Sequence, residues 1–134
     1  AAGEELPVVR DYEERRHRLR LGLLPEEPKE MAIVPLHEGE VIYHVSRPVY
    51  TEEAQTGAGR RPVGEGTLMV TNLRLVFRQG SHVTEISLRD IATVEEAQPG
   101  FLVGVGDHEP HYYFPPALDP VYEAVRAALA ALPV

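Results

Sequence analysis

Three arginines in and near one polar loop are the residues of this chain best suited to hold an anion. Arg60 and Arg61 are adjacent in the Gly-containing segment 51–62, and Arg47 ends the stretch before it. A guanidinium binds phosphate or carboxylate through two parallel hydrogen bonds. The same loop also carries two glutamates. Anion or lipid binding by Arg47, Arg60 and Arg61 is therefore one hypothesis, and an ordinary solvated loop is the alternative.

The densest basic run lies near the N-terminus and contains Arg15, Arg16, Arg18 and Arg20. On a helix, such a run is suited to an anionic membrane surface or to an acidic partner. The alternative is a helix that packs on its own domain while its arginines pair with nearby glutamates. Because the apolar stripe of this helix is thin and is interrupted by an arginine, we favour the second interpretation.

Two histidines three residues apart, His108 and His111, give the clearest hint of a metal site. Imidazole and carboxylate groups bind zinc, and Asp107 and Glu109 lie beside them. The pair falls in an expected turn, however, with no distant third ligand and no helical HExxH motif. We therefore predict no metal and no other cofactor.

The serines, histidines and aspartate that could supply a catalytic triad are Ser46, Ser81, Ser87, His44, His82 and Asp90. They fall on alternating faces of expected strands and none lies in a nucleophile elbow, whereas a triad is defined by its geometry. The Gly57-Ala58-Gly59 segment lacks the Gly-Lys-Ser/Thr ending of a phosphate-binding loop and precedes a strand. We predict no catalytic residue and no enzymatic activity.

Composition limits the classes of function further. A length of 134 residues suits one domain, and the absence of cysteine excludes disulfides and thiolate metal sites. A net charge of −8 repels nucleic acid, and it repels anionic membranes unless a local basic patch reverses it. All but one of the 13 basic residues are arginines, and scarce Asn and Cys with 12 prolines are typical of a thermostable protein or of a GC-rich genome.

The chain shows no targeting or anchoring signal of its own. No apolar run approaches the ~20 residues of a membrane span, and no signal-peptide pattern opens the sequence. The sequence begins Ala1-Ala2-Gly3 without an initiator Met, which fits a processed, tagged or excised piece of a longer protein. We expect a bacterial, cytoplasmic protein, peripheral at the inner face of the membrane if its arginines bind lipid.

Helical periodicity is confined to the two ends of the chain. A helix is predicted from Asp11, as N-cap, to Leu24, before the Pro-containing linker PEEPKE. A second helix is predicted from Pro120 to about Ala131, with Asp119 as its cap. Its apolar face is formed by Val121, Val125, Ala128, Leu129 and Leu132.

Between these helices the apolar pattern has period 2 and predicts about seven strands. The clearest signal is Gly64–Gly80, a hairpin with a turn at Asn72 and one buried face to which Leu73, Leu75 and Phe77 contribute. The other strands are expected at 40–50, 82–88, 91–97, 101–105 and 111–114. The first of these is expected to bury Val41, Tyr43 and Val45 on one face.

Short antiparallel strands need closure or cover, and a helix with one apolar face, placed last, can plug a bent sheet. The predicted fold is α+β, mainly β. It is a partly open β-barrel of about seven antiparallel strands capped by the C-terminal helix. Residues 1–30 form an N-terminal helical extension and linker, and residues 31–134 form the domain.

Three motifs in this order resemble GRAM and bacterial PH-like domains, which have the pleckstrin-homology (PH) fold. They are Leu36–Val41, the stretch from Gly66-Thr67-Leu68 to Phe77, and Ser87–Ile91 with Val94-Glu95. The resemblance covers about residues 34–132 and implies a PH-like barrel that is non-enzymatic and often lipid-associated. Many PH domains bind phosphoinositides through basic residues of the loop between the first two strands, and the matching loop here holds Arg60 and Arg61 without any Lys.

The predicted function is a non-catalytic binding module for a protein partner or for self-association. Two routes are β-augmentation at an open sheet edge and exchange of the N-terminal helix across its linker. The first alternative is a peripheral module that binds a membrane or a lipid headgroup. The least favoured alternative is a small metal-dependent enzyme. We identify no small-molecule substrate and expect no nucleic-acid partner.

Overall fold

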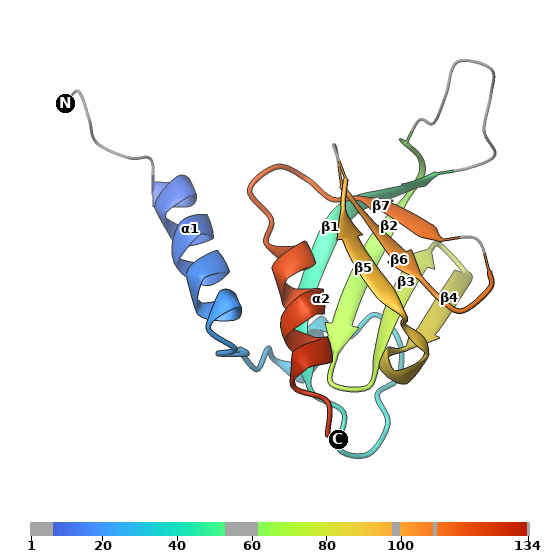
Figure 1. The fold of residues 1–134 in the computed structure, drawn as a ribbon, viewed down its shortest axis with the longest axis horizontal. Helices are drawn as coiled ribbons and strands as arrows, with labels where there is room; N and C mark the ends of the chain where they lie inside the picture. Colours follow the sequence, from blue (N-terminus) through green and yellow to red (C-terminus); the bar gives the residue numbers. More distant parts are fainter. Residues whose placement is uncertain (1–6, 53–61, 98–99, 109, 134) are drawn as a thin grey trace.

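Seven antiparallel strands curve around a C-terminal helix in the computed structural model, which describes residues 7–52, 62–97, 100–108 and 110–133 (Figure 1). The elements are α1 (Pro7–Arg20), the 3₁₀ turn η1 (Lys29–Met31), β1 (Ile42–Glu52), β2 (Pro62–Thr71), β3 (Arg74–Gln79), β4 (His82–Ser87), the 3₁₀ turn η2 (Leu88–Asp90), β5 (Thr93–Glu96), β6 (Phe101–Gly104), β7 (His111–Phe114) and α2 (Val121–Ala130).

The strands form one sheet in the order β4-β3-β2-β1-β7-β6-β5, so that β4 and β5 are its two edges. The long strand β1 pairs with β2 over its length and with β7 at its end, where Tyr50 lies opposite Phe114. Strand β1 thus joins the β2–β4 half of the sheet to the β5–β7 half. The predicted fold of about seven antiparallel strands capped by a C-terminal helix is confirmed.

The core is filled from both sides, by inward-facing strand residues and by α2. Val121, Val125 and Ala128 of α2 are buried in the same cluster as Phe101 and Tyr113. These three helical positions confirm the predicted apolar face of the last helix. The helix itself begins at Val121, one residue later than predicted, and the Asp119 carboxylate accepts a hydrogen bond from the Val121 amide at 3.1 Å.

The β2–β3 hairpin is buried on both faces, and the prediction of a single buried face was wrong. Leu75 and Phe77 face the barrel core, whereas Val76 lies in a second buried cluster on the outside of the sheet. The segment 32–36 covers that outer face, with Ala32, Ile33, Val34 and Leu36 packed against it. Leu73 lies in the turn instead of on the buried face and is 40% exposed.

The buried positions of β1 also differ from the prediction. Ile42, His44, Ser46 and Val49 are buried, whereas Val41, Tyr43 and Val45 are only partly so. Two causes act together: irregular pairing with β2 shifts the register along β1, and the segment 32–36 covers the outer face. Two polar side chains, His44 and Ser46, are consequently enclosed.

Helix α1 runs from Pro7 to Arg20, so the predicted bounds of Asp11 and Leu24 were wrong by four residues at each end. It ends at a Schellman motif in which Gly22, with φ +82°, donates to the Leu19 carbonyl while Leu23 donates to the Arg18 carbonyl. Glycine, rather than the later prolines, stops the helix. Asp11 lies inside the helix and pairs with Arg15 at 3.3 Å.

Candidate functional site

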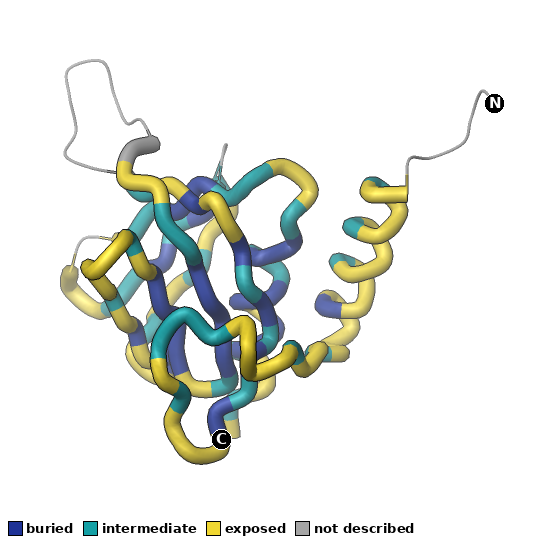
Figure 2. Tube along the Cα trace, turned by 180° about the vertical axis from the view of Figure 1, so that it is seen from behind, coloured by how far each residue is buried: buried dark blue, intermediate teal, exposed yellow. Residues whose placement is uncertain are grey.

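Helix α1 stands beside α2 and meets the domain near its C-terminal end (Figure 1). Its one buried residue, Leu19, packs against Ala124 and Ala127 of α2. Arg16 adds an ion pair, with its Nε 2.8 Å from Oε1 of Glu123. The rest of α1 is mostly exposed, as the predominantly yellow helix in Figure 2 shows. The helix is therefore attached through a small contact that leaves most of its surface available.

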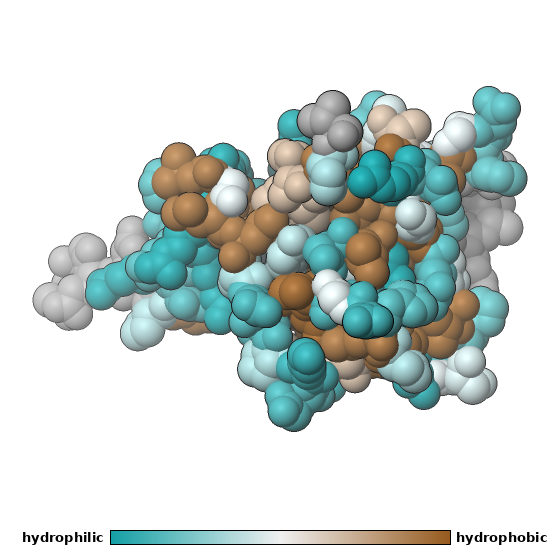
Figure 3. All heavy atoms as spheres, turned by 90° about the horizontal axis from the view of Figure 1, so that it is seen from below, coloured by the Kyte–Doolittle hydropathy of each residue, from teal (hydrophilic) through white to brown (hydrophobic). Residues whose placement is uncertain are grey.

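The segment after α1 is also attached to the sheet. Glu27 forms an isolated antiparallel bridge with Ile42 at the start of β1, and its amide donates to the Ile42 carbonyl at 2.8 Å. Leu21 and Leu23, between this bridge and the helix, are 63% and 58% exposed. Seen from below, apolar side chains gather beside the largely hydrophilic helix and continue toward the barrel (Figure 3).

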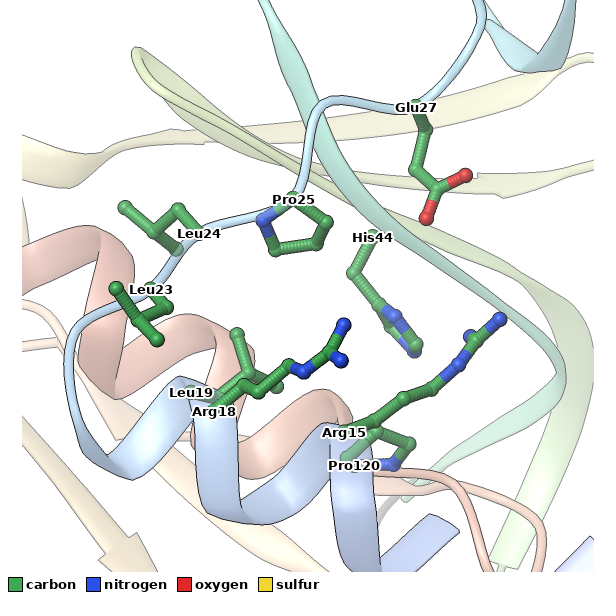
Figure 4. Close-up of a pocket in the computed structure, with 9 residues that line it drawn as sticks. All are labelled: Arg15, Arg18, Leu19, Leu23, Leu24, Pro25, Glu27, His44 and Pro120. Carbon is green, nitrogen blue, oxygen red and sulfur yellow. The ribbon is translucent and has the colours of Figure 1, made fainter. Parts of the chain in front are cut away.

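A hollow of about 580 Å³ lies where α1, this segment and the start of α2 meet β1 (Figure 4). We call it the α1–β1 hollow. The residues that line it are Arg15, Arg18, Leu19, Leu23, Leu24, Pro25, Glu27, His44 and Pro120. Two of the arginines that the sequence singled out thus face one space, together with an apolar wall.

The basic run of α1 is divided between two faces of the helix. Arg16 and Arg20 point to Glu123 of α2, at 2.8 and 3.9 Å, and the hydrogen bond from Arg16 to Glu123 raises the pKa of that arginine. Arg15 and Arg18 turn to the α1–β1 hollow and are more than half exposed. A continuous basic face of all four arginines, as a membrane surface would use, is not formed.

Next to the hollow, through His44 and Pro120 of its lining, the Asp119 carboxylate joins β1 to the start of α2. His44 Nε2 lies 2.7 Å from Oδ1 of Asp119, and the Ser46 hydroxyl donates to Oδ2 at 2.9 Å. The serine and the histidine both bond to the aspartate, so the acid lies in the middle. A catalytic triad needs the histidine between the other two, and this trio therefore ties two elements together instead of activating a nucleophile.

The predicted anion site at the first loop is only partly described. Arg60 and Arg61 lie outside the described residues. Arg47 is exposed within β1, not at its end, and borders a shallow hollow of about 490 Å³ together with Pro48, Glu65, Gly66 and Thr67. Its lining thus contains one arginine and one glutamate.

The two histidines of the predicted turn do not form a metal centre with their described neighbours. His111 begins β7 and stacks on Tyr113, and burial lowers its pKa, with a further decrease from the nearby His108. Among the residues that the structure describes, no group of three potential metal ligands lies close enough to hold an ion.

A second hollow, of about 440 Å³, lies on the other side of α1 and reaches the edge strand β5. It is lined by Glu96 at the end of β5, by α2 residues that include Tyr122 and Glu123, and by Leu19 and Arg20 of α1. We call it the α2–β5 hollow. Residues Thr93, Glu95 and Glu96 of β5 are exposed.

The most connected polar cluster among the described residues surrounds Arg74, and it was not predicted from the sequence. The guanidinium of the buried Arg74 contacts both carboxylate oxygens of Glu40, at 2.8 and 2.9 Å, as well as Glu85 and the Pro35 carbonyl. Thr71 donates to Glu40 at 2.7 Å. Glu40, Thr71 and Arg74 belong to the motifs that resemble GRAM domains, and their spacing was the available signal. The cluster holds the segment 32–36 and the hairpin together, which is a structural role.

Comparison with known proteins defines the class of fold. The chain has the PH-like fold: it is similar to the structure titled "Vps36 N-terminal PH domain", with a TM-score of 0.57 and 16% identity over 78% of this chain and 90% of that chain. It is also similar to the C-terminal domain of an unknown protein from Leishmania infantum, with a TM-score of 0.54 and 14% identity over 69% of this chain and 87% of the other. No family model matches the sequence, and no curated protein matches it significantly. At these identities the likeness shows the fold alone.

The described helices can be compared with the length and apolar character that a membrane-spanning helix needs. Neither α1 nor α2 is long and apolar enough to cross a bilayer.

Proposed function

We propose that this chain is a non-catalytic binding module that pairs the edge strand β5 with an extended segment of another protein or of a second copy. The observation that carries the proposal is the position of β5, a short sheet edge beside the α2–β5 hollow. An added strand gains main-chain hydrogen bonds from such an edge, and an adjacent hollow receives alternate side chains.

The register of the β5–β6 hairpin indicates which groups are offered. The amide of Ala97 donates to the Gly100 carbonyl, and Glu95 lies opposite Leu102. Because inward and outward groups alternate along an antiparallel ladder, the amides of Val94 and Glu96 are directed away from β6. Glu95 and Glu96 make this edge acidic, which favours a neutral or basic partner segment.

Selection of a displayed random-peptide library against the full chain tests this proposal. We expect extended, neutral or basic peptides to be enriched. Glu96→Pro removes one outward amide without touching the ladder to β6, and it should weaken binding of a selected peptide at least tenfold. Glu96→Gln is the matched control, because it keeps the amide and removes only the charge. Failure to enrich any peptide, or equal binding by Glu96→Pro and the wild type, would contradict the proposal.

Self-association through the same β5 edge leads to a separate prediction. If a second copy supplies the strand, light scattering across a concentration series should show a dimer that Glu96→Pro abolishes. A monomer at every concentration, together with peptide capture, assigns the edge to a different protein.

The runner-up function is a peripheral membrane or lipid-headgroup module that uses Arg47, Arg60 and Arg61 or the arginines of α1. Co-sedimentation with anionic and neutral vesicles at low and physiological salt separates the two functions, because electrostatic lipid binding weakens steeply with ionic strength. Membership of the GRAM family is likewise a proposal, and the way in which its motif residues Glu40, Thr71 and Arg74 join in one network supports it.

A further inference from the structure

The α1–β1 hollow combines two kinds of wall. Leu19, Leu23, Leu24 and Pro25 form its apolar side, and Arg15 and Arg18 supply nitrogen atoms on the other, beside His44, whose Nε2 already bonds to Asp119. In Figure 4 the guanidinium of Arg18 lies on the Pro25 side of the His44 imidazole, and the guanidinium of Arg15 lies on the other side of that ring. At about 580 Å³ the hollow falls within the roughly 300–1,000 Å³ typical of small-molecule sites, which are mainly apolar with a few orienting polar groups.

The two arginines have hydrogen-bonding capacity for a ligand. Arg15 uses its Nε for Asp11 at 3.3 Å, and Arg18 uses Nη2 for Glu14 at 3.2 Å. A guanidinium carries five N–H groups, so each pair occupies only part of the fork. Exposed pairs between residues one helical turn apart are weak, and an anion inside the hollow competes with them readily.

A bare anion does not account for the apolar wall. Leu23 is more than half exposed although it sits between two elements of the fold, and Leu24 is half-buried beside it. An alkyl chain along these leucines would remove apolar surface from water while its head group meets the arginines. The hollow therefore fits a ligand with one anionic end and one apolar end.

We propose that the α1–β1 hollow binds a single-chain anionic amphiphile, with a carboxylate or phosphate head between Arg15 and Arg18 and an alkyl tail against the Leu23–Pro25 wall. Glu27 also lines the hollow, and its carboxylate repels such a head group. Binding joins α1, the following segment and the barrel through one ligand. The site is distinct from the β5 edge. Ligand binding can therefore be found without strand pairing at β5, and strand pairing can be found without ligand binding.

Calorimetric titration of the full chain with laurate and with dodecyl phosphate, each kept below its aggregation threshold, tests the proposal. Both probes should bind with one-to-one stoichiometry, whereas inorganic phosphate and uncharged dodecyl maltoside should bind at least tenfold more weakly. The two charged probes separate a fatty-acid-like head from a phosphate-ester head. Preference for either one supports the proposal.

Substitutions in the hollow then locate the ligand. Arg15→Gln with Arg18→Gln should weaken binding at least tenfold, Leu23→Asp should do the same, and Glu27→Gln should strengthen it severalfold. Arg10→Gln is the matched control, because it removes an exposed arginine of the same helix that does not line the hollow. All these side chains except Glu27 are exposed, and circular dichroism verifies that each variant is folded.

A second readout follows from the bridging position of the ligand: bound dodecyl phosphate should slow amide exchange within α1. Equal affinity for dodecyl maltoside, or unchanged affinity in the double arginine variant, would overturn the proposal. So would capture of anionic vesicles without binding of either monomeric probe, because that result assigns the arginines to a membrane surface.

Discussion

The Nε atom of Arg74 lies 2.8 Å from Oε2 of Glu40, in a pair that is 34 residues apart in sequence and almost fully enclosed. Glu40 also accepts from the amide of His37 at 2.9 Å and from the hydroxyl of Thr71 at 2.7 Å. These bonds connect the segment that covers the outer face of the sheet with the β2–β3 turn. A buried ion pair of this kind is expensive to break on one side only.

Glu40→Gln should therefore lower the free energy of unfolding by about 3–5 kcal/mol, because it leaves the guanidinium of Arg74 buried without its main counter-charge. Urea unfolding at neutral pH measures the loss. Glu38→Gln removes a carboxylate from the same turn at an exposed position and should change stability by less than about 0.5 kcal/mol. Equal effects of the two substitutions would show that the buried pair contributes little.

The same carboxylate predicts a specific pH dependence. Burial alone would raise the pKa of Glu40, but hydrogen bonds from Arg74, His37 and Thr71 outweigh it and lower the pKa from 4.5 to about 2. The pKa of Glu40 is lower in the folded than in the unfolded state. The stability that the charged carboxylate contributes is therefore fully present above the unfolded pKa, and it is lost as the pH falls from about 5 to about 2. Across this range the free energy of unfolding should change with pH by about 3 kcal/mol less in Glu40→Gln than in the wild type, and denaturation curves measure the difference.

Leu19→Ala should release α1 from the domain. This leucine is the buried side chain of α1 and meets the small residues Ala124 and Ala127, so truncation removes most of the apolar contact. We expect amide hydrogen exchange in α1 to accelerate at least tenfold while the protection of β2 and β3 stays unchanged. Leu21→Ala, at an exposed position two residues later, provides the comparison. Protection of α1 that survives Leu19→Ala would mean that the pair between Arg16 and Glu123 is sufficient.

Asp119→Ala should destabilise the fold by about 2–4 kcal/mol, because three partners lose their acceptor together: His44, Ser46 and the amide of Val121. Ser46→Ala removes only one of these bonds and should cost about 1 kcal/mol. Thermal and urea unfolding of the two variants give the comparison. A loss for Asp119→Ala no greater than that for Ser46→Ala would show that the aspartate does not connect the three groups energetically.

Gly66→Ala should destabilise the sheet by about 1–3 kcal/mol. A β-carbon at this position would lie 2.5 Å from the Arg78 carbonyl oxygen and 2.7 Å from Cζ of Phe77. The backbone of β3 would have to move to make room. Gly104→Ala is the informative comparison, since its β-carbon would overlap with Oγ1 of Thr93, and that side chain can rotate away. The midpoint of urea unfolding should fall more for Gly66→Ala than for Gly104→Ala.

The order of elements could be predicted because α2 and strands such as β6 place their core-facing residues at a regular spacing. Period 2 through the hairpin and spacings of three and four residues in 121–128 are local signals, and the structure has them. The prediction of a one-sided hairpin failed because the covering segment 32–36 has no periodicity of its own and packs against strands far along the chain. The C-terminal end of α1 could have been predicted from the sequence, because Gly22 is the glycine that a C-terminal cap requires.

The candidate sites were less accessible from sequence for a related reason. Spacing assigned Arg15, Arg16, Arg18 and Arg20 to one basic run, whereas the packing of α1 on α2 divides them between two faces. His44 and Asp119 are 75 residues apart, and their contact depends on where α2 begins relative to β1. Neither relation has a signature in local patterns, because both depend on how distant elements dock.

The bridge between Glu27 and Ile42 turns the preceding six residues, 21–26, into a short tether that holds α1 beside its own docking surface. A tether of this length gives a local helix concentration on the order of millimolar. A helix from a second copy at micromolar concentration is therefore outnumbered roughly a thousandfold. Exchange of α1 between copies competes with docking on its own domain only at a very high local concentration of the protein. It also competes where a ligand or partner first occupies the docking surface of the helix.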